Sequence, residues 1–406
     1  MQKLLRMSVQ QFDLVVAGGG VAGCSLALAL AQQTQLKIAI VEKQPETEYR
    51  IEQASATQAD VSDARVVALA EQSWEFLKSL GVAESLRQIV TPIDHIHVSD
   101  RGHLGQCELS SAEYNVPALG YVCGLSPLLH KLEQELKEAK VTWLRPDSVK
   151  TLQQKESQIL IETEHEQLET KLLVVAEGGE SDTRKKLGFV TQQKQYQQVA
   201  LVTNIRANKP HHGTAYERFT QDGPLALLPL GERDYSVVWS LKAGEQEDLL
   251  SMTDADFLVE LQEAFGYRAG IFEQCSQRQS FPLKLVTMPN TVGHRCALVG
   301  NAVHTIHPIA GQGLNLGLRD IDELVKQIVN HSADDIGRFE LLNAYQQARL
   351  ADQKRVVSMT DGLVSVFSNQ HIPFVIGRNL GLFAMQFLTS LKRPLARQAM
   401  GQISNR

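Results

Sequence analysis

Three glycines near the start of the chain have the spacing of a nucleotide-binding turn. Gly18, Gly20 and Gly23 form the pattern G-x-G-x-x-G between a valine-rich apolar run and an alanine- and leucine-rich run. In such a turn the first glycine permits a tight bend, the second lets the backbone approach a pyrophosphate, and the third lets the helix pack closely on the strand. The amide groups at the start of the helix favour phosphate charge. The pattern therefore predicts a dinucleotide site.

Glu42 supplies the acidic group that such a site uses. It ends the next apolar run, roughly twenty residues after the glycine turn. A carboxylate there accepts hydrogen bonds from ribose hydroxyls. The same charge repels a 2′-phosphate, which argues against NADP at this site.

A second glycine-rich segment lies at residues 300–317. It begins with Gly300 and Asn301 after an apolar run, and it reaches Gly311-Gln312-Gly313 where a helical pattern begins, with Asn315 just beyond. Backbone N–H groups at such a helix start stabilise negative charge. A reduced flavin carries that charge on its pyrimidine edge. Together the two glycine segments predict FAD.

The segments between these glycines have the hydrophobic pattern of an α/β fold. Short valine-rich runs predict buried parallel strands, and alanine- and leucine-rich or amphipathic runs predict helices. The predicted strands span 12–17, 36–41, 172–176 and 296–299, the predicted helices span 22–33, 64–80, 125–139, 254–265 and 312–330, and a hairpin is predicted within 150–170. The first strand, helix and strand form a βαβ unit of the size that dinucleotide binding requires.

After Gly188 the pattern changes to antiparallel strands with turn residues between them. These strands are expected at 198–206, 214–219, 223–229 and 234–241, and helices are expected from Phe339 onward. We therefore predict an α/β fold with a Rossmann-like FAD-binding domain, an inserted substrate domain with a mixed or antiparallel sheet, and a C-terminal helical tail. The predicted boundaries are 1–180 and 285–345 for the discontinuous FAD-binding domain, 181–284 for the substrate domain and 346–406 for the tail.

Composition argues against several classes of protein. The 406 residues carry a net charge of −6, which argues against nucleic acid as a partner. No apolar run is long enough to cross a membrane, and no signal peptide is expected. The five cysteines are scattered and odd in number, which fits reduced thiols and a cytoplasmic location. His304 and His307 have no clustered partner ligands, so no metal site is expected.

These motifs resemble the flavoprotein aromatic hydroxylases related to para-hydroxybenzoate hydroxylase, over almost the whole chain. The first motif of that family falls on 18–23, its Asp-Gly motif on Glu177-Gly178 with Ser181 and Arg184, and its Gly-Asp motif on Gly300-Asn301. Glu177 and Asn301 depart from the family pattern, because both replace an aspartate. Asn301 can still accept a hydrogen bond through its carbonyl oxygen. The Glu177 replacement is expected to weaken or displace the role of that residue near FAD and the nicotinamide donor.

Within this family the chain is most similar to the ubiquinone-biosynthesis branch, of the 2-polyprenyl-6-methoxyphenol hydroxylase type. Three further segments carry this likeness, residues 97–103, 217–226 and 375–379, and we refer to them as the branch segments. The family resemblance also implies that Arg65 lies beside the flavin. It implies that NAD(P)H visits transiently to reduce FAD, and that an oxygen atom from O2 is transferred to an electron-rich phenol.

The sequence does not identify a catalytic acid or base. His304 and Pro308 are the candidates, and His304 fits a structural role at least as well. Tyr216, Phe219 and Trp239 lie on the predicted substrate sheet, where each fits a substrate pocket or, better, the core.

The tail offers a route to a prenylated substrate, which would need access to a membrane. Residues 379–391 are mostly apolar, and Lys392, Arg393 and Arg397 follow. An apolar face with a basic flank fits a helix at a membrane interface. A helix packed against the protein or a partner chain fits equally well.

The sequence thus predicts an FAD-dependent monooxygenase that uses NAD(P)H and O2 to hydroxylate a polyprenylated phenol on the way to ubiquinone. The expected partners include a biosynthetic complex and, peripherally, the inner face of the cytoplasmic membrane. One alternative is a hydroxylase of the same fold for another ring position or another aromatic. Another is a flavin-binding scaffold with little activity of its own. A plain NAD dehydrogenase would bind no flavin, and the presence of the glycine pair within residues 311–313 would then be unexplained.

Overall fold

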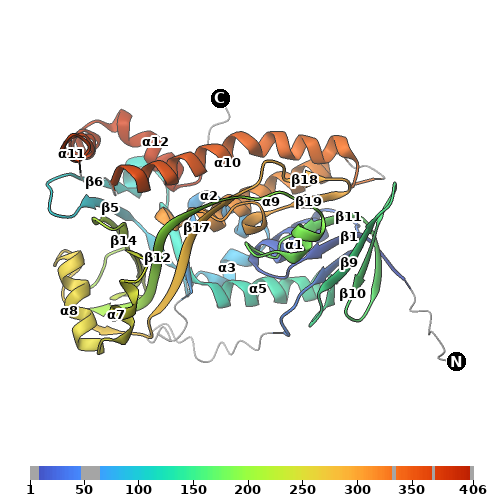
Figure 1. Cartoon of the computed structure of the whole chain (residues 1–406), viewed down its shortest axis with the longest axis horizontal. Helices are drawn as coiled ribbons and strands as arrows, with labels where there is room; N and C mark the ends of the chain where they lie inside the picture. The colour runs from blue at the N-terminus through green and yellow to red at the C-terminus, as the bar shows by residue number, and fades with distance from the viewer. Residues whose placement is uncertain (1–8, 47–64, 332–334, 368–370, 403–406) are drawn as a thin grey trace.

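A largely parallel sheet occupies one half of the molecule in space (Figure 1). The computed structural model describes residues 9–46, 65–331, 335–367 and 371–402. The strands of this first sheet are β1 (Gln10–Ala17), β2 (Ile38–Val41), β8 (Thr142–Leu144), β9 (Val149–Gln154), β10 (Ile159–Thr163), β11 (Gln167–Val175), β18 (Val292–Gly293) and β19 (Cys296–Leu298). Their order is β18-β19-β11-β1-β2-β8, and β9 and β10 extend the sheet as an antiparallel hairpin beside β11. The predicted strands and the hairpin are confirmed.

Both faces of this sheet are buried, which explains its continuous apolar runs. Leu14 and Val16 of β1 point into a core shared with helices, whereas Val15 and Ala17 point into a second core on the other face. The helices that contribute buried side chains to the first of these cores are α1 (Val21–Gln33), α2 (Glu71–Ser79), α3 (Val82–Leu86), α5 (Leu125–Glu138), α9 (Gln312–Asn330) and the start of α10 (Phe339–Phe367). Parallel strands covered on both faces are characteristic of α/β proteins.

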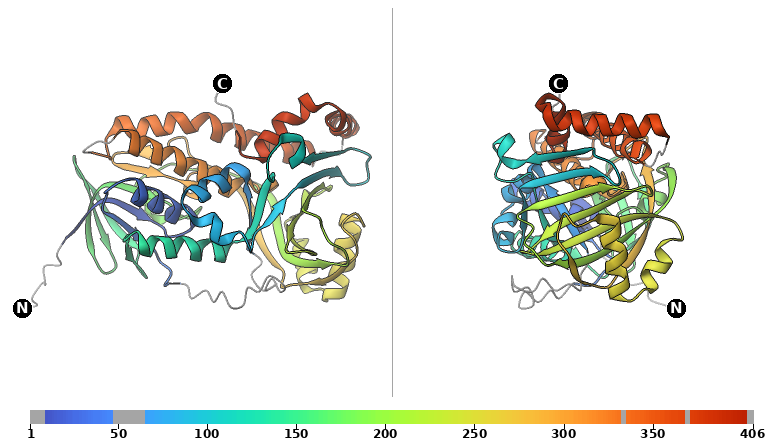
Figure 2. Two further views of the ribbon diagram at one scale, coloured as in Figure 1. Left: turned by 180° about the vertical axis from the view of Figure 1, so that it is seen from behind. Right: turned by 90° about the vertical axis from the view of Figure 1, so that its left-hand side faces the viewer.

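A second, mixed sheet forms the other half of the molecule (Figure 2). Its strands are β5 (His95–Asp100), β6 (Gln106–Ser110), β12 (Gln192–Ala207), β13 (Thr214–Phe219), β14 (Pro224–Leu230), β15 (Asp234–Lys242), β16 (Phe272–Cys275) and β17 (Gln279–Thr287). Neighbouring strands are antiparallel except β13 and β5, which run parallel. Helices α7 (Gln246–Ser251) and α8 (Asp254–Phe265) pack on it. The sheet therefore draws strands from before the predicted range 181–284, because β5 pairs with β13 and β6 pairs with β5.

The predicted helix over 64–80 is wrong in its first third. Residues Val66–Ala70 form β3, which pairs antiparallel with β7 (Gly120–Gly124), and β7 also pairs with β4 (Thr91–Ile93). A short run that is apolar throughout has no period that separates a buried strand from a helix. Ala64, the first residue of that predicted helix, lies outside the described residues.

The tail is helical, as predicted. Helix α10 runs alongside both sheets, and α11 (Ile372–Phe387) and α12 (Thr389–Ala399) follow it at the end that holds the second sheet (Figures 1 and 2). In the described part of the chain, no helix is by itself long and apolar enough to cross a membrane. Helices α11 and α12 reach that length only together, and a bend of 93° separates them. Short segments α4 (Ser111–Tyr114), α6 (Asp182–Lys186), η2 (Gly300–Ala302) and η3 (Ile309–Gly311) complete the structure.

The three branch segments converge on one buried carboxylate, Asp100. Its Oδ2 accepts hydrogen bonds from Arg378 Nε (2.8 Å) and Asn379 Nδ2 (2.8 Å), both on α11. Phe219 of β13 lies opposite Asp100 in the parallel β13–β5 ladder. The Phe219 ring stacks on Phe367 at the end of α10, with ring centroids 3.6 Å apart. Residues distant in sequence thus fasten the tail to the second sheet.

We expect the Asp100→Asn variant to lose about 3 to 5 kcal/mol of unfolding free energy, because it leaves the buried Arg378 guanidinium without its counter-charge. Urea denaturation measures this change. The matched control is Asp322→Asn, which breaks the exposed helical pair between Asp322 and Lys326. That control should cost no more than about 1 kcal/mol. Equal losses in the two variants would contradict the anchoring role of Asp100.

Candidate cofactor site

The glycine turn between β1 and α1 has one position that faces open space. A Cβ on Gly18, whose φ is +108°, would lie 2.6 Å from the Ala176 carbonyl oxygen, and a Cβ on Gly23 would lie 1.9 Å from the Gly18 carbonyl oxygen. These two glycines are therefore required by packing. A Cβ on Gly20 would meet no atom within 4 Å. The backbone of Gly20 is extended, with φ −72° and ψ −177°, a conformation open to any residue.

At position 20, therefore, neither the backbone conformation nor contact with the rest of the protein requires a glycine. The remaining reason for a glycine is the close approach of a ligand. Helix α1 begins there without a side-chain cap and without an acidic residue in its first turn. The N–H groups of that turn are left to bind an anion, which the helix dipole also favours. This arrangement fits the pyrophosphate of a dinucleotide.

Glu42 holds the turn from the end of β2. Its Oε2 accepts a hydrogen bond from Gly19 N (2.6 Å), and its Oε1 accepts one from Gln44 N (2.8 Å). Each carboxylate oxygen has a further lone pair for a ribose hydroxyl. The position of Glu42 beside the turn agrees with the sequence prediction, and its contact with ribose stays a prediction.

The second glycine segment meets the first through Gly300. A Cβ on Gly300, whose φ is +61°, would lie 3.2 Å from Ala22 Cβ of α1. A Cβ on Gly317 of α9 would lie 2.9 Å from the Gly300 Cα. Because Gly311 is about 9 Å from Gly317 along the helix, the N-termini of α1 and α9 lie on the same side of the first sheet. The structure brings together the two segments that the sequence predicted to share one ligand.

The N-terminus of α9 also lacks a cap. Gly311 has a φ of +61° and precedes the helix, whose first turn holds no acidic residue and no side-chain cap. Gly313 follows in that turn, and Gln312 is buried. Asn301 is exposed on η2, where its side chain can reach a ligand.

Asn315 fastens this glycine segment to β3. Its Nδ2 donates to the carbonyl oxygens of Ala68 and Gly311, and its Oδ1 accepts from Ala70 N, each at 2.8 Å. Asn315 therefore positions the turn through protein contacts. Arg65 immediately precedes β3 and is exposed, so the same contacts place it near the start of α9.

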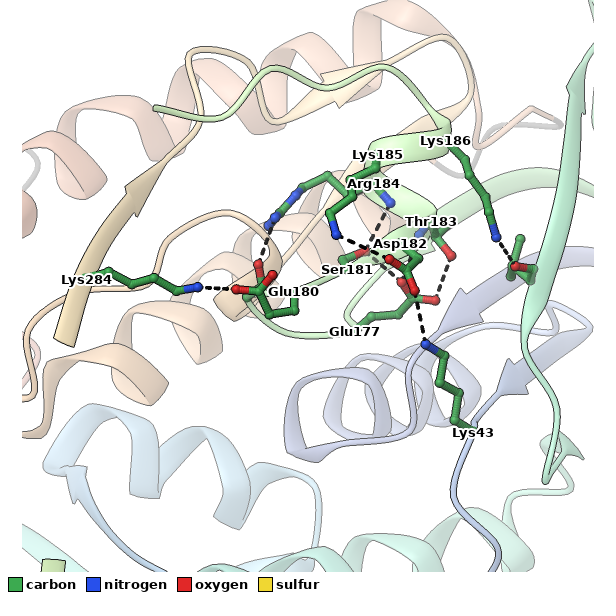
Figure 3. A network of polar contacts seen from close by, with 12 residues as sticks. Lys43, Glu177, Glu180, Ser181, Asp182, Thr183, Arg184, Lys185, Lys186 and Lys284 are labelled. Carbon is green, nitrogen blue, oxygen red and sulfur yellow. Dashed lines mark hydrogen bonds and ion pairs between the residues drawn. The ribbon is translucent and has the colours of Figure 1, made fainter. Parts of the chain in front are cut away.

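The middle motif ties these parts together around a buried arginine (Figure 3). Arg184 is 2% exposed and donates to the carbonyl oxygens of Gly179 (2.8 Å) and Ala302 (2.9 Å). Burial lowers the pKa of this guanidinium, although Glu180 and Glu177 oppose the shift. Arg184 thus joins the middle motif to η2.

Glu177 faces the segment that follows it and caps α6. Its carboxylate accepts hydrogen bonds from Ser181 Oγ (2.7 Å), Thr183 N (3.1 Å) and Thr183 Oγ1 (2.6 Å), as Figure 3 shows. Three protein donors hold this carboxylate. In this chain Glu177 shapes the 177–184 turn, and its direct role at the cofactor stays a prediction.

Comparison with known proteins agrees with this geometry. The family model described as FAD binding domain matches residues 11–360. The chain belongs to this family. It is 31% identical to ubiquinone hydroxylase UbiL of Rhodospirillum rubrum, over 96% of this chain and 90% of the relative. It is also 31% identical to 3-demethoxyubiquinol 3-hydroxylase of Escherichia coli, over 97% of this chain and 100% of the relative.

The fold is also that of solved monooxygenases. The structure of p-nitrophenol 4-monooxygenase PnpA from Pseudomonas putida matches with a TM-score of 0.77 at 15% identity, covering 98% of this chain and 100% of that chain. The protein is a flavoprotein monooxygenase with FAD as its cofactor. The predicted family, its ubiquinone-biosynthesis branch, the Rossmann-like fold and FAD are confirmed.

The flavoprotein holds His304 in a buried polar network that the sequence did not reveal. His304 Nε2 lies 2.8 Å from Asp320 Oδ2, and Asp320 Oδ1 accepts from Arg349 Nε (2.8 Å) and Gln353 Nε2 (2.9 Å). Although burial alone would raise it, the pKa of Asp320 falls to about 2 because His304 and Arg349 stabilise the carboxylate. The network positions the segment before Pro308 against α9 and α10. The sequence signal for it is the adjacent charged pair Arg319 and Asp320 among the apolar residues within 314–325 of a helix whose buried side also holds Gln312 and Asn315.

The aromatic residues predicted on the second sheet fall mostly in its core. Trp239 belongs to the core beneath α7 and α8, and Phe219 is buried against α10. Tyr216 is half-buried, and its ring lies edge-on to Phe265 with centroids 5.4 Å apart. These contacts support the packing role rather than the pocket.

His307 is fully buried without a hydrogen-bond partner for either ring nitrogen among the described residues. Its ring lies edge-on to Tyr196, with centroids 5.4 Å apart. Burial lowers the pKa of His307 to about 4, against a smaller opposing effect of Asp361. The imidazole is therefore neutral at neutral pH.

We expect Gly20→Val to abolish FAD retention while changing the unfolding free energy of the flavin-free protein by less than about 1 kcal/mol. The added side chain enters only the open space that the pyrophosphate would take. By contrast, Gly23→Ala should cost the flavin-free protein at least about 2 kcal/mol, because its Cβ collides with backbone. Flavin absorbance and urea denaturation measure the two effects. Normal flavin content in Gly20→Val would contradict the placement of the pyrophosphate.

We expect His307 to weaken the fold in mild acid. Because its folded pKa lies below the ordinary value of 6.5, the unfolded chain takes up a proton first, so stability is lost as pH falls from about 6.5 toward 4. Between pH 7 and 5 the wild type should lose about 2 kcal/mol more than His307→Gln. Urea denaturation at both pH values measures the difference. Parallel losses in the two proteins would show that His307 is protonated without cost.

Proposed function

We propose that this flavoprotein uses NAD(P)H and O2 to hydroxylate a polyprenylated phenol in ubiquinone biosynthesis. The observation that carries the proposal is the near-complete match to relatives named for ubiquinone hydroxylation, at 31% identity. The convergence of the three branch segments around Asp100 supports it, because the segments that resemble this branch form one structural unit beside the second sheet.

Different segments of the chain would bind different parts of FAD. The N-terminus of α1 with Gly20 would bind the pyrophosphate, Glu42 the ribose, and the N-terminus of α9 the pyrimidine edge of the flavin ring. When bound, FAD supplies electron transfer and the activation of O2 for oxygen transfer. The protein must hold the phenol ring near the flavin and exclude water while oxygen is transferred. Asn301 and Arg65 are exposed, and they are our candidates for contacts to the flavin.

In the sequence, His304 and Pro308 are the candidates for a catalytic group. The Asp320 contact places His304 in the protein interior, so we assign it the positioning of the 303–308 segment. Pro308 is half-buried, and its carbonyl accepts from Gly311 N (3.1 Å), which helps to shape the turn before α9.

A hydroxylase for another ring position is the second candidate. It is favoured by the differing reactions of the relatives, since one is named for the 3-position of demethoxyubiquinol and a structural neighbour acts on p-nitrophenol. A flavin-binding scaffold would have the same FAD site but would not hydroxylate a substrate.

We expect a strain that lacks this gene to lose ubiquinone and to accumulate a prenylated precursor. This precursor should have one hydroxyl group fewer than the product of the proposed step. Quinone profiling by mass spectrometry measures this, and the mass and ring pattern of the precursor identify the position. In vitro, the purified yellow protein should oxidise NAD(P)H faster when that phenol is added. Normal ubiquinone in the strain would overturn the assignment. Loss of ubiquinone without any phenol-stimulated oxidation would instead support the scaffold.

A further inference from the structure

One side of α11 is a continuous exposed apolar surface. Its members are large side chains three or four residues apart, and we refer to them as the outer face of α11: Ile372, Ile376, Leu380, Phe383 and Phe387. Such spacing places them on one side of a helix. All five are between 54% and 73% exposed. Single exposed apolar residues are ordinary, but an aligned row of this size marks an interaction surface.

The opposite side of α11 is firmly attached to the protein, so the outer face is held pointing away. Arg378 and Leu382 are the buried residues of this helix. Arg378 forms the buried ion pair with Asp100 and also donates to the Phe367 carbonyl oxygen (3.1 Å). Asn379 Oδ1 accepts from Gly105 N (2.8 Å), and Gln386 Oε1 accepts from Glu108 N (2.9 Å). Because α11 is attached in this way, its outer face is exposed in the folded protein.

The neighbouring hairpin adds to this surface. Leu104 lies at the tip between β5 and β6 and is 95% exposed, with the exposed Arg101 and His103 beside it. The Gly105–Asn379 hydrogen bond places this tip against α11. Figures 1 and 2 show the hairpin and the two last helices at the same end of the molecule.

The last part of the chain carries basic residues and no acidic ones. From residue 362 to residue 406 the sequence contains no aspartate or glutamate, although the whole chain has a net charge of −6. Arg393 and Arg397 on α12 are exposed, and Lys392 is paired with Glu113 (3.1 Å). An apolar row with cationic side chains at its edge is complementary to a surface that is apolar inside and anionic outside.

We propose that the outer face of α11, with Leu104, docks onto the surface of an anionic lipid bilayer, with α11 lying in the plane of the interface. The 93° bend before α12 and the Lys392–Glu113 pair keep α12 on the protein, which favours this orientation over insertion. A second copy of the chain is the less favourable occupant, because it would bring its own cationic edge to the same surface. The proposal does not depend on the proposed substrate.

Docking there would place the second sheet beside the bilayer. Asp100 joins α11 to β5, and β5 pairs with β13, so the docked helix is fixed directly to the sheet predicted to bind substrate. If the proposed function holds, a prenylated phenol could pass from lipid to protein without crossing water.

Vesicle sedimentation tests the proposal. The FAD-loaded protein should bind vesicles of phosphatidylcholine with phosphatidylglycerol, and bind more weakly to phosphatidylcholine alone. The double variant Phe383→Glu, Phe387→Glu should reduce binding roughly tenfold or more, because it sets two charges in the apolar face. The matched control is Val259→Glu on α8, since Val259 is 57% exposed, as is Phe383. Arg393→Gln with Arg397→Gln should reduce binding only to the anionic vesicles.

Further readouts separate the alternatives. Flavin content and NAD(P)H oxidation with a short-chain soluble phenol should be unchanged in every variant, which shows that the variants fold. Failure of the wild type to bind vesicles, or equal binding by the double variant, would overturn the proposal. So would a dimer in light scattering that the double variant abolishes, because the face would then be an interface between copies. Vesicle binding needs no turnover, so its outcome is independent of the proposed reaction.

Discussion

The close contact between α1 and α9 at Gly300 is the constraint on which the cofactor site depends. Gly317 of α9 lies against the backbone of Gly300, and Gly300 lies against Ala22 of α1. Any larger residue at either glycine would push the two helices apart. Because the positive ends of both helix dipoles then lie on one side of the first sheet, one anionic ligand can use both. Arg184 and Asn315 hold the surrounding turns in that arrangement.

A second buried contact organises the other half of the molecule. The Asp100–Arg378 pair lies where the β5–β6 hairpin, the second sheet and the tail meet. A buried ion pair is costly to break, because either charge left alone is poorly solvated. The pair therefore makes the tail part of the sheet's structure and sets the direction in which the outer face of α11 points. The attachment of the tail to the second sheet and the exposure of that face follow from the same contact.

The polar interior of this flavoprotein is the part that sequence patterns did not predict. Motif positions predicted that Ser181 and Arg184 belong with the middle motif, but not that Arg184 joins it to Ala302. From the sequence, His304 fits a structural role at least as well as a flavin contact, and only its contact with Asp320 shows which groups surround it. Local periodicity predicts a helix where Val66–Ala70 forms a strand, because the pairing partner β7 lies some fifty residues away in the sequence.

The sequence by itself determined the family, the two glycine segments, the βαβ unit and most strands of the first sheet, because backbone geometry and burial leave local signatures in residue type and spacing. Tertiary structure alone decided which of these signatures meet. It showed that Gly20 faces open space while Gly18 and Gly23 face protein, that Glu177 is directed at α6, and that Asp100 unites three distant segments. Such contacts join residues separated by up to hundreds of positions, and no local pattern specifies them.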